Sequence, residues 1–235
     1  MNVFKLIVLS FFAFILSACG GSDGDDNPSP VVPDSDAVYE LTFTTNWNAA
    51  NFPTNFPNDR HFSGLIGLTH NSDIKLYEVG QLASPGVVSM AETGSKTILK
   101  TEIEEQQNKG NAHSTIDGNG VPASSTSVTV TFNISQEHPL ATVVTMIAPS
   151  PDWFTGVNSV PLFTNGQWVD ETELDAISYD AGSDSGTVFN SANLVTSPQE
   201  PITRLSTDRA DTDFDNGINA SNSLPIGSFK FKRIK

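Results

Sequence analysis

The chain has 235 residues, 17% of them charged, and a formal net charge of −15 at pH 7. This length suffices for one domain with a sizeable core. The acidic balance excludes nucleic acid and anionic lipid headgroups as favoured partners, because like charges repel, and it favours cations. Few charged residues, with many of Gly, Pro, Ser and Thr, are typical of an extracytoplasmic β protein.

Residues 1–18 have the pattern of a secretory signal peptide. Lys5 precedes a continuous apolar run at 6–16, which is too short to remain as a membrane-spanning helix. Leu-Ser-Ala-Cys at 16–19 fits the bacterial lipobox, in which the cysteine is lipidated and becomes the new N-terminus. We therefore expect Cys19, the only cysteine, to carry the acyl chains that anchor the protein. The alternative is an ordinary signal peptide with a cysteine near its cleavage site.

Residues 19–36 are expected to be the lipidated cysteine and a flexible acidic linker, because "GGSDGDDNPSPVVPDSD" offers almost nothing to bury. Gly20 follows the cysteine in place of Asp, which by the usual sorting rule favours the outer membrane. The sequence thus predicts an outer membrane lipoprotein, on the periplasmic or the cell-surface face, with a folded domain at 37–235.

Five segments of the folded domain have the pattern of strands. Apolar residues alternate with polar ones at 39–47 and again at 127–135, which predicts half-buried strands. The run at 141–149 is continuously apolar, as in a central strand with both faces covered. Shorter strands are expected at 64–70 and 228–234.

Only residues 97–109, "TILKTEIEEQQNK", have a helical pattern for more than two turns, and a strand followed by a loop is the alternative. Many short strands with little helix predict an all-β fold, an antiparallel β-sandwich.

The stretch "YDAGSDSGT" at 179–187 places Asp180 and Asp184 four residues apart among small residues. So small and polar a segment is not expected in a core, and glycines at 182 and 186 disfavour a helix. Calcium takes six to eight oxygen ligands, often carboxylates and loop carbonyls, and glycines let a loop bend around the ion. The stretch can therefore supply part of a calcium site.

Asp152, in "APSPDWFTGV" at 148–157, is the candidate for the missing carboxylate. The prolines of this loop restrict its backbone, and Trp153 and Phe154 are expected to anchor it to the core. Two alternatives stay open. The aspartates can cap turns through backbone N–H groups, or a carboxylate pair can act in a hydrolase that cleaves polysaccharide.

Other chemistries find little support in the sequence. A single cysteine excludes thiolate zinc sites and leaves no disulfide partner. The histidines at 61, 70, 113 and 138 are scattered and form no metalloprotease motif. "DTDFDNG" at 211–217 resembles the start of an EF-hand loop but has Asn222 where the loop requires a glutamate, so a solvated acidic loop is the favoured interpretation.

Several segments of the chain resemble the spondin N-terminal domain, the family named for the F-spondin extracellular-matrix proteins. "APSPDWFTGV" is close to the family signature, and "DAGSDSG" differs from the usual "DAGTDSG" only at Ser183. Further similar segments occur in the order of the family pattern: "YELTFTTNWNAANFP" at 39–53, "HFSGLIGLTHNSDIKLYEVGQLASPGV" at 61–87 and "PITRL" at 201–205.

The resemblance implies a β-sandwich like that of C2 domains, with one Ca²⁺ ion bound by loops at one end. It maps the calcium carboxylates onto Asp152, Asp180 and Asp184. It also implies a binding or adhesion module in place of an enzyme. We therefore expect a protein or glycan ligand at the cell envelope, membrane attachment through the lipid anchor, and no nucleic acid. A purely structural envelope lipoprotein is the remaining alternative.

Overall fold

Strands dominate the residues that the computed structural model describes, 34–205 and 225–235. The strands in chain order are β1 (Asp36–Thr45), β2 (His61–Phe62), β3 (Ile66–His70), β4 (Ala112–Asp117), β5 (Ser127–Ser135), β6 (Leu140–Ala148), β7 (Trp153–Pro161), β8 (Phe163–Thr164), β9 (Gln167–Trp168), β10 (Glu171–Asp180), β11 (Thr203–Arg204) and β12 (Gly227–Arg233). Two helices, α1 (Pro85–Thr93) and α2 (Thr97–Asn108), lie between β3 and β4.

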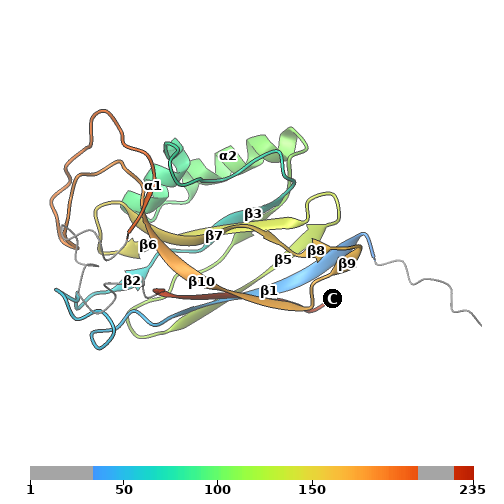
Figure 1. Ribbon diagram of the computed structural model, residues 1–235, viewed down its shortest axis with the longest axis horizontal. Coiled ribbons are helices and arrows are strands. Elements are labelled where there is room, and N and C mark those ends of the chain that lie inside the picture. Colours follow the sequence, from blue (N-terminus) through green and yellow to red (C-terminus); the bar gives the residue numbers. More distant parts are fainter. Residues whose placement is uncertain (1–33, 206–224) are drawn as a thin grey trace, which may run out of the picture. The chain divides into compact units, whose positions relative to one another are not determined.

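Ten strands form one antiparallel sheet. Its main path runs β4-β3-β6-β7-β10-β12-β1-β5, with β2 added to β6 and β11 added to β10. The two end strands of the path, β4 and β5, lie close to each other, so the sheet folds back on itself into two layers (Figure 1). The larger core fills the space between these layers and includes Phe43, Phe62, Trp153 and Phe231. This arrangement confirms the all-β sandwich expected from the sequence.

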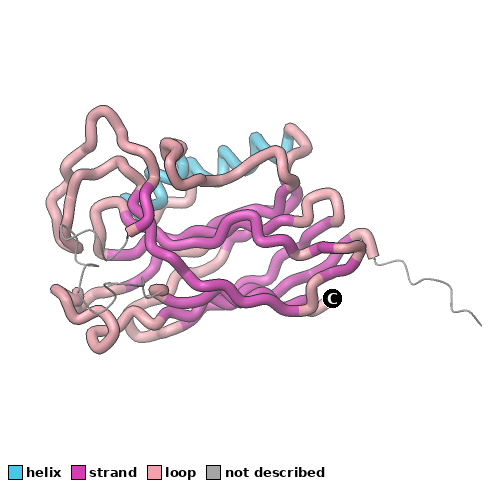
Figure 2. Tube along the Cα trace, in the orientation of Figure 1, coloured by secondary structure: helices cyan, strands magenta, loops and turns pink. Residues whose placement is uncertain are grey.

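The long strand β10 joins the two layers. Its first part, residues 171–176, pairs with β12 in one layer, and its last part, residues 177–180, pairs with β7 in the other. Figure 2 shows the strand running diagonally from one layer to the other. Because β10 changes partner midway, the hydrogen-bonded path stays continuous where a sandwich usually has two separate sheets.

The two helices cover the outer face of the layer that contains β3, β6 and β7 (Figure 1). The helix expected at 97–109 is confirmed as α2, which buries Leu99 and Ile103 against this layer. Helix α1 was not predicted, although Ser84 caps its first turn by accepting from the Val87 N–H and Gly94 ends it with φ of +70°. No helix within the described ranges is long and apolar enough to cross a bilayer.

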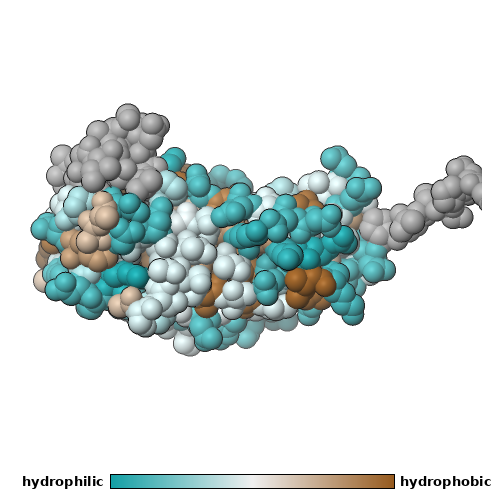
Figure 3. Space-filling view, turned by 90° about the horizontal axis from the view of Figure 1, so that it is seen from below, coloured by the Kyte–Doolittle hydropathy of each residue, from teal (hydrophilic) through white to brown (hydrophobic). Residues whose placement is uncertain are grey.

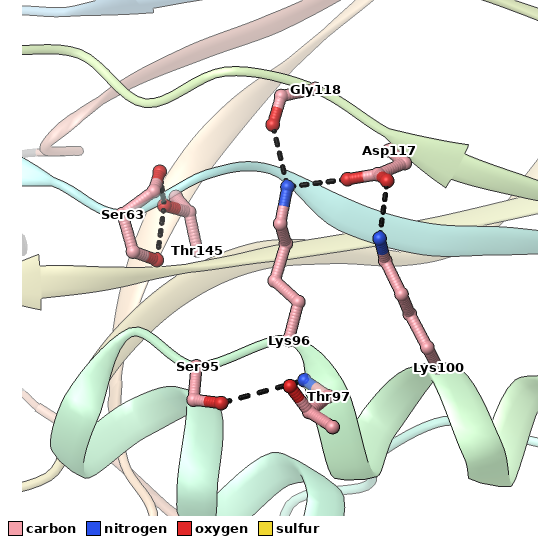
Figure 4. Close-up of polar contacts among 8 residues, drawn as sticks. All are labelled: Ser63, Ser95, Lys96, Thr97, Lys100, Asp117, Gly118 and Thr145. Atoms are coloured by element: carbon pink, nitrogen blue, oxygen red, sulfur yellow. Dashed lines mark hydrogen bonds and ion pairs between the residues drawn. The ribbon is translucent and has the colours of Figure 1, made fainter.

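Two lysines attach α2 to the edge strand β4. Lys96 and Lys100 both reach the carboxylate of Asp117, and Lys96 also donates to the Gly118 carbonyl at 2.9 Å (Figure 4). The paired ammonium groups lower the pKa of Asp117 against the opposing effect of burial. A short edge strand that is bonded to a helix at its end is poorly suited to pair with another chain.

The five strands expected from the sequence are all present. β1 alternates buried and exposed side chains along its length, and β6 is buried from Ala141 to Ala148. The outward face of the β12-β1-β5 layer is hydrophilic or intermediate in hydropathy over most of its area (Figure 3). On it Thr42 and Thr129 lie opposite each other with their hydroxyl oxygens 3.1 Å apart.

His70 is a buried titratable group of this framework. Its ring is fully buried, with Nδ1 2.6 Å from the Asn71 carbonyl and Nε2 2.8 Å from the Thr142 hydroxyl. Burial lowers its pKa, and nearby His138 acts in the same direction.

We therefore expect His70 to contribute a loss of stability as the pH falls from 7.5 to 5.5, separate from the contributions of other buried groups. The unfolded chain takes up a proton near pH 6.5 while folded His70 resists protonation, so the unfolded state binds more protons in this window. Urea denaturation at both pH values measures the effect. On going from pH 7.5 to 5.5, His70→Gln should lose less stability, or gain more, than the wild type, whereas His113→Gln, at an exposed side chain, is the control and should respond as the wild type does. An unchanged difference in His70→Gln would contradict the assignment.

Candidate metal centre at the loop end of the sandwich

The pairing of β7 with β10 brings two of the three predicted aspartates together. Trp153, the first residue of β7, lies opposite Asp180, the last residue of β10. Asp152 directly precedes β7, so it is next to Asp180 at the same end of the sheet. A backbone bond from the Ala181 N–H to the Asp152 carbonyl, 3.2 Å long, continues the pairing past the strand end.

Asp152 holds the loop that follows β10. Its Oδ2 atom accepts three hydrogen bonds: from the Ser183 N–H at 2.7 Å, the Ser183 hydroxyl at 3.2 Å and the Asp184 N–H at 3.0 Å. Its other oxygen, Oδ1, is buried and has no hydrogen-bond partner among the described residues. A buried carboxylate oxygen without a partner is unfavourable unless something else neutralises it.

Asp180 and Asp184 shape the same loop through their own turns. Asp180 Oδ1 accepts from the Gly182 N–H at 2.7 Å, and Asp184 Oδ1 accepts from the Gly186 N–H at the same distance. Asp184 Oδ2 also accepts from the Leu194 N–H at 2.9 Å, which closes the loop of residues 184–194 at its base. These are the bonds that the turn-capping alternative requires. They do not exclude metal binding, because a carboxylate oxygen has a second lone pair.

The expectation that this stretch lies outside the core is wrong. Residues 180–184 are all buried, and Asp152, Asp180 and Asp184 are 0%, 7% and 5% exposed. The reason is that the backbone of neighbouring loops covers them: the Glu200 N–H donates to the Gly182 carbonyl at 2.8 Å. Small polar residues fit in such a place because their groups bond to backbone.

The electrostatics of the site follow from this burial. Removal from water raises the pKa of Asp152 to about 7, the negative charge of Asp180 adds to the rise, and the hydrogen bonds from Ser183 and Asp184 oppose it. A carboxyl group with a pKa near 7 is ionised only in part at neutral pH. A cation beside Asp152 and Asp180 would favour the ionised form of both.

The arrangement fits a cation in part. Within residues 34–205 and 225–235, no three side chains of His, Cys, Asp and Glu are placed so that they hold a metal ion together. Asp184 in particular uses both oxygens on backbone N–H groups. The carboxylate oxygen that is left without a hydrogen bond among the described residues is Asp152 Oδ1, beside Asp180. Loop carbonyl oxygens are the other ligands that calcium accepts. The three-aspartate calcium set therefore stays a prediction.

Buried aromatic residues anchor the loops to the core. Trp153 and Phe154 are fully buried, as expected from the sequence. The ring of Phe189 returns the long loop to the core, 5.5 Å from Trp153 and 5.4 Å from Trp47 between ring centroids. Neither Phe189 nor Ser183 was singled out from the sequence for a role here. A lone aromatic residue in a polar stretch was the available signal for Phe189.

The other candidate residues do not join this centre. His113 and His138 stack at a centroid distance of 5.9 Å beside β4, and His70 lies on β3. Cys19 and the acidic segment 211–217 lie outside the described residues, as do the predicted signal peptide and most of the linker.

Comparison with known proteins tests the family resemblance. The spondin N-terminal family model (Spondin_N) matches residues 37–218. The chain belongs to the spondin N-terminal domain family. It is 33% identical to human spondin-2 over 203 residues, which are 85% of this chain and 58% of that protein. It is 34% identical to chicken spondin-1 over 181 residues, 72% of this chain and 22% of that protein.

The spondin relatives also limit what can be transferred. The chain spans little more than half of human spondin-2 and about a fifth of chicken spondin-1, so activities of the whole relatives do not carry over with the domain. The relatives come from vertebrates and therefore give no support to the bacterial origin suggested by the lipobox-like sequence. A spondin-type domain does fit a binding or adhesion module that works outside the cytoplasm.

Gly182 offers a test of how tightly the loop is built. Its φ is +73°, and a Cβ added there would lie 2.1 Å from the Glu200 carbonyl oxygen. We expect Gly182→Ala to lower the free energy of unfolding by more than about 2 kcal/mol. The substitution adds the strain of a left-handed alanine, and it also forces the backbone around Glu200 to move away from the new methyl group. Urea denaturation measures the change.

Gly166 provides the matched control. Its φ of +75° is nearly the same, but a Cβ added there has nothing within 4 Å. Gly166→Ala should therefore cost only about 1 kcal/mol, the strain of a left-handed alanine. Equal effects of the two substitutions would show that the contact with Glu200 is not restrictive.

Proposed function

We propose that the chain is a calcium-binding, membrane-anchored extracytoplasmic binding or adhesion module of the spondin type. Asp152, Asp180 and Asp184 would bind one Ca²⁺ ion, and Cys19 would carry the lipid anchor. The observation that carries the calcium proposal is the buried Oδ1 oxygen of Asp152, which has no partner among the described residues and lies in a carboxyl group next to Asp180.

Calcium suits these residues better than a purely structural role does. Two neighbouring buried carboxylates repel each other, and hydrogen bonds to a single oxygen of Asp152 leave the second one desolvated. A hard dication removes both penalties at once and accepts the loop carbonyls as further ligands. Binding would order the loops at this end of the sandwich.

The partner we propose is a protein or glycan ligand at the cell envelope. Calcium would act there by stiffening the binding loops or by bridging to an acidic group of the ligand. The net charge of −15 disfavours nucleic acid as a partner. The anchor would place the module on the periplasmic or cell-surface face of an outer membrane.

One observation bears on the alternative of a carboxylate-dependent hydrolase. A carboxyl group with a raised pKa, as in Asp152, is what a general acid requires. Asp152 is fully buried, however, and Asp180 and Asp184 are nearly so. A single ion needs far less room than a polysaccharide, so burial favours the calcium proposal, and we propose no enzymatic activity.

Calcium should raise the thermal stability of the wild-type protein. At a hundredfold excess over its dissociation constant, a ligand that binds only the folded state adds about 2.7 kcal/mol, or roughly 5–10 °C for a chain of this size. Asp180→Asn combined with Asp184→Asn should abolish this gain, and so should Asp152→Asn alone. Differential scanning calorimetry in calcium and in chelator, with isothermal titration, measures both effects.

Glu173→Gln serves as the control because that carboxylate is exposed on β10, outside the loops. It should keep the full calcium response. If the wild type melts at the same temperature in calcium and in chelator, the proposed site does not bind the ion. Asp152→Asn should also be as stable as the wild type in chelator, since it removes a buried charge.

The anchor is tested separately. Cys19→Ser should move the protein from the membrane fraction to the soluble fraction when the full chain is expressed in a bacterial host, because the acylated residue is lost. Metabolic labelling with a radioactive fatty acid should mark the wild type only. Retention of the Cys19→Ser variant on membranes, without label in either protein, would refute lipidation at this residue.

A further inference from the structure

A pocket of about 290 Å³ opens where β10 leaves β7. β10 pairs with β12 through residues 171–176 and with β7 only through residues 177–180, so Leu174 and Asp175 are not paired with β7, where this pairing ends at Gly156. Figure 2 shows the two strands separating. The segment of Tyr77, Glu78 and Val79 lines the pocket as well. The pocket thus results from the change of partner along β10.

Strand β7 has a bulge at the same place. Its register against β6 shifts by one extra residue between Val157 and Val160, and Ser159 has a positive φ of 54°. The bulge turns Asn158 toward the 77–79 segment, and its side-chain nitrogen donates to the Tyr77 carbonyl at 2.5 Å. Asn158 also accepts from the Thr142 and Ser159 hydroxyls, so the side chain that holds this segment is itself fixed.

Aromatic rings form one wall of the pocket. Tyr77 packs edge-on against Phe154 at 5.2 Å and against Tyr179 at 5.4 Å between ring centroids. Tyr77 is only 5% exposed, and its buried hydroxyl lies close enough to the Tyr179 side chain to interact with it. Burial raises the pKa of Tyr77 well above its usual value, and Tyr179 adds to the rise, so the hydroxyl stays neutral.

The two charged residues that line the pocket are both acidic. Glu78 and Asp175 are exposed at its rim, and none of its lining residues, all within the described part of the chain, is basic. Lys75 pairs with Glu78 at 2.5 Å from outside, through two side chains that are about half exposed. Such an exposed pair is weak and exchanges readily with a competing cation. Val79, Val157 and Leu174 supply apolar contacts between the charged rim and the rings.

We propose that this pocket binds an organic cation on an aliphatic stem, an alkylguanidinium or alkylammonium group such as the side chain of arginine or lysine. The carboxylates of Glu78 and Asp175 would pair with the charge, and the aliphatic wall and the tyrosine rings would contact the stem. This site is separate from the proposed calcium centre and goes beyond it.

Titration of the full chain with butylguanidinium, butylammonium and the peptide Ala-Arg-Ala tests the proposal. Isothermal titration and NMR shifts of Tyr179 and Asp175 follow binding, with calcium held constant and a second series run in chelator. We expect saturable binding with a dissociation constant of about 1 mM or below. Tighter binding of the peptide identifies a protein partner as the source of the cation, and equal binding identifies a small solute. The absence of saturation with all three probes up to about 10 mM would overturn the proposal.

Three variants locate the binding. Asp175→Asn should weaken the affinity roughly fivefold, as for an exposed ion pair. Tyr179→Leu should weaken it roughly threefold, because the partly exposed ring that lines the pocket is lost as a contact for the stem and the charge. Glu105→Gln, at a residue of α2 that lines a different hollow, is the matched control and should bind as the wild type.

A merely structural role of Tyr179 would instead give lower stability with unchanged affinity. Equal affinity of the wild type and the combined Glu78→Gln, Asp175→Asn variant would also overturn the assignment. Because cation binding is measured with and without calcium, failure of this pocket and failure of the calcium site give different results.

Discussion

The register between β7 and β10 is the constraint on which the functional end of this domain depends. With Trp153 opposite Asp180, the residue before one strand and the last residue of the other come together, and the Asp152 carboxylate reaches the backbone of the next loop. A slip of one residue would turn every side chain of β10 to the other face. The buried aromatic rings of Trp153 and Phe154 oppose such a slip. Core packing therefore decides the positions of the acidic groups.

Much of the fold could be predicted because burial of one face of a strand produces a regular alternation of apolar and polar residues in the sequence. The alternation in β1 and β5 and the apolar run of β6 each indicated a strand that the structure contains. β7 and β10 were harder to identify. β7 contains Gly156 and the bulge at Asn158 and Ser159, which break the period of two, and β10 starts in one layer and ends in the other. Helix α1 carries capping signals at Ser84 and Gly94, but its nine residues are too few for a clear helical period.

The site was predictable only in part, and the reason is physical. Residue types and family resemblance pointed to Asp152, Asp180 and Asp184, and the structure does bring these three residues into one buried region. The local sequence does not reveal which distant residues cover this segment. Burial of 180–184 depends on backbone from residues near Glu200, and closure of the loop depends on the Leu194 N–H. These contacts are long-range, so composition alone suggested an exposed segment.

β10 connects the two candidate sites. Its last residue is one of the predicted calcium ligands, Tyr179 before it lines the pocket, and Asp175 lies at the pocket rim. The two sites differ in what they offer. The loop aspartates are buried and suit a small hard ion, whereas the pocket has an open, acidic rim over aromatic rings and suits a larger cation with an apolar stem. Both draw on the negative charge that dominates this chain.

The positions of the ends of β1 and β10 determine how a pulling force would act on the domain. β1 starts with Asp36 opposite Ser135, and Thr45 at its other end lies beside Gly227, which pairs in turn with Ala176 of β10. Because β1 and β10 are both antiparallel to β12, Asp180 is at the end of the sheet far from Asp36. A force applied between Asp36 and the loop aspartates would run along the strands. It would load the ladder bonds of β1, β12 and β10 together in shear, a geometry in which many hydrogen bonds must break at once instead of opening one after another.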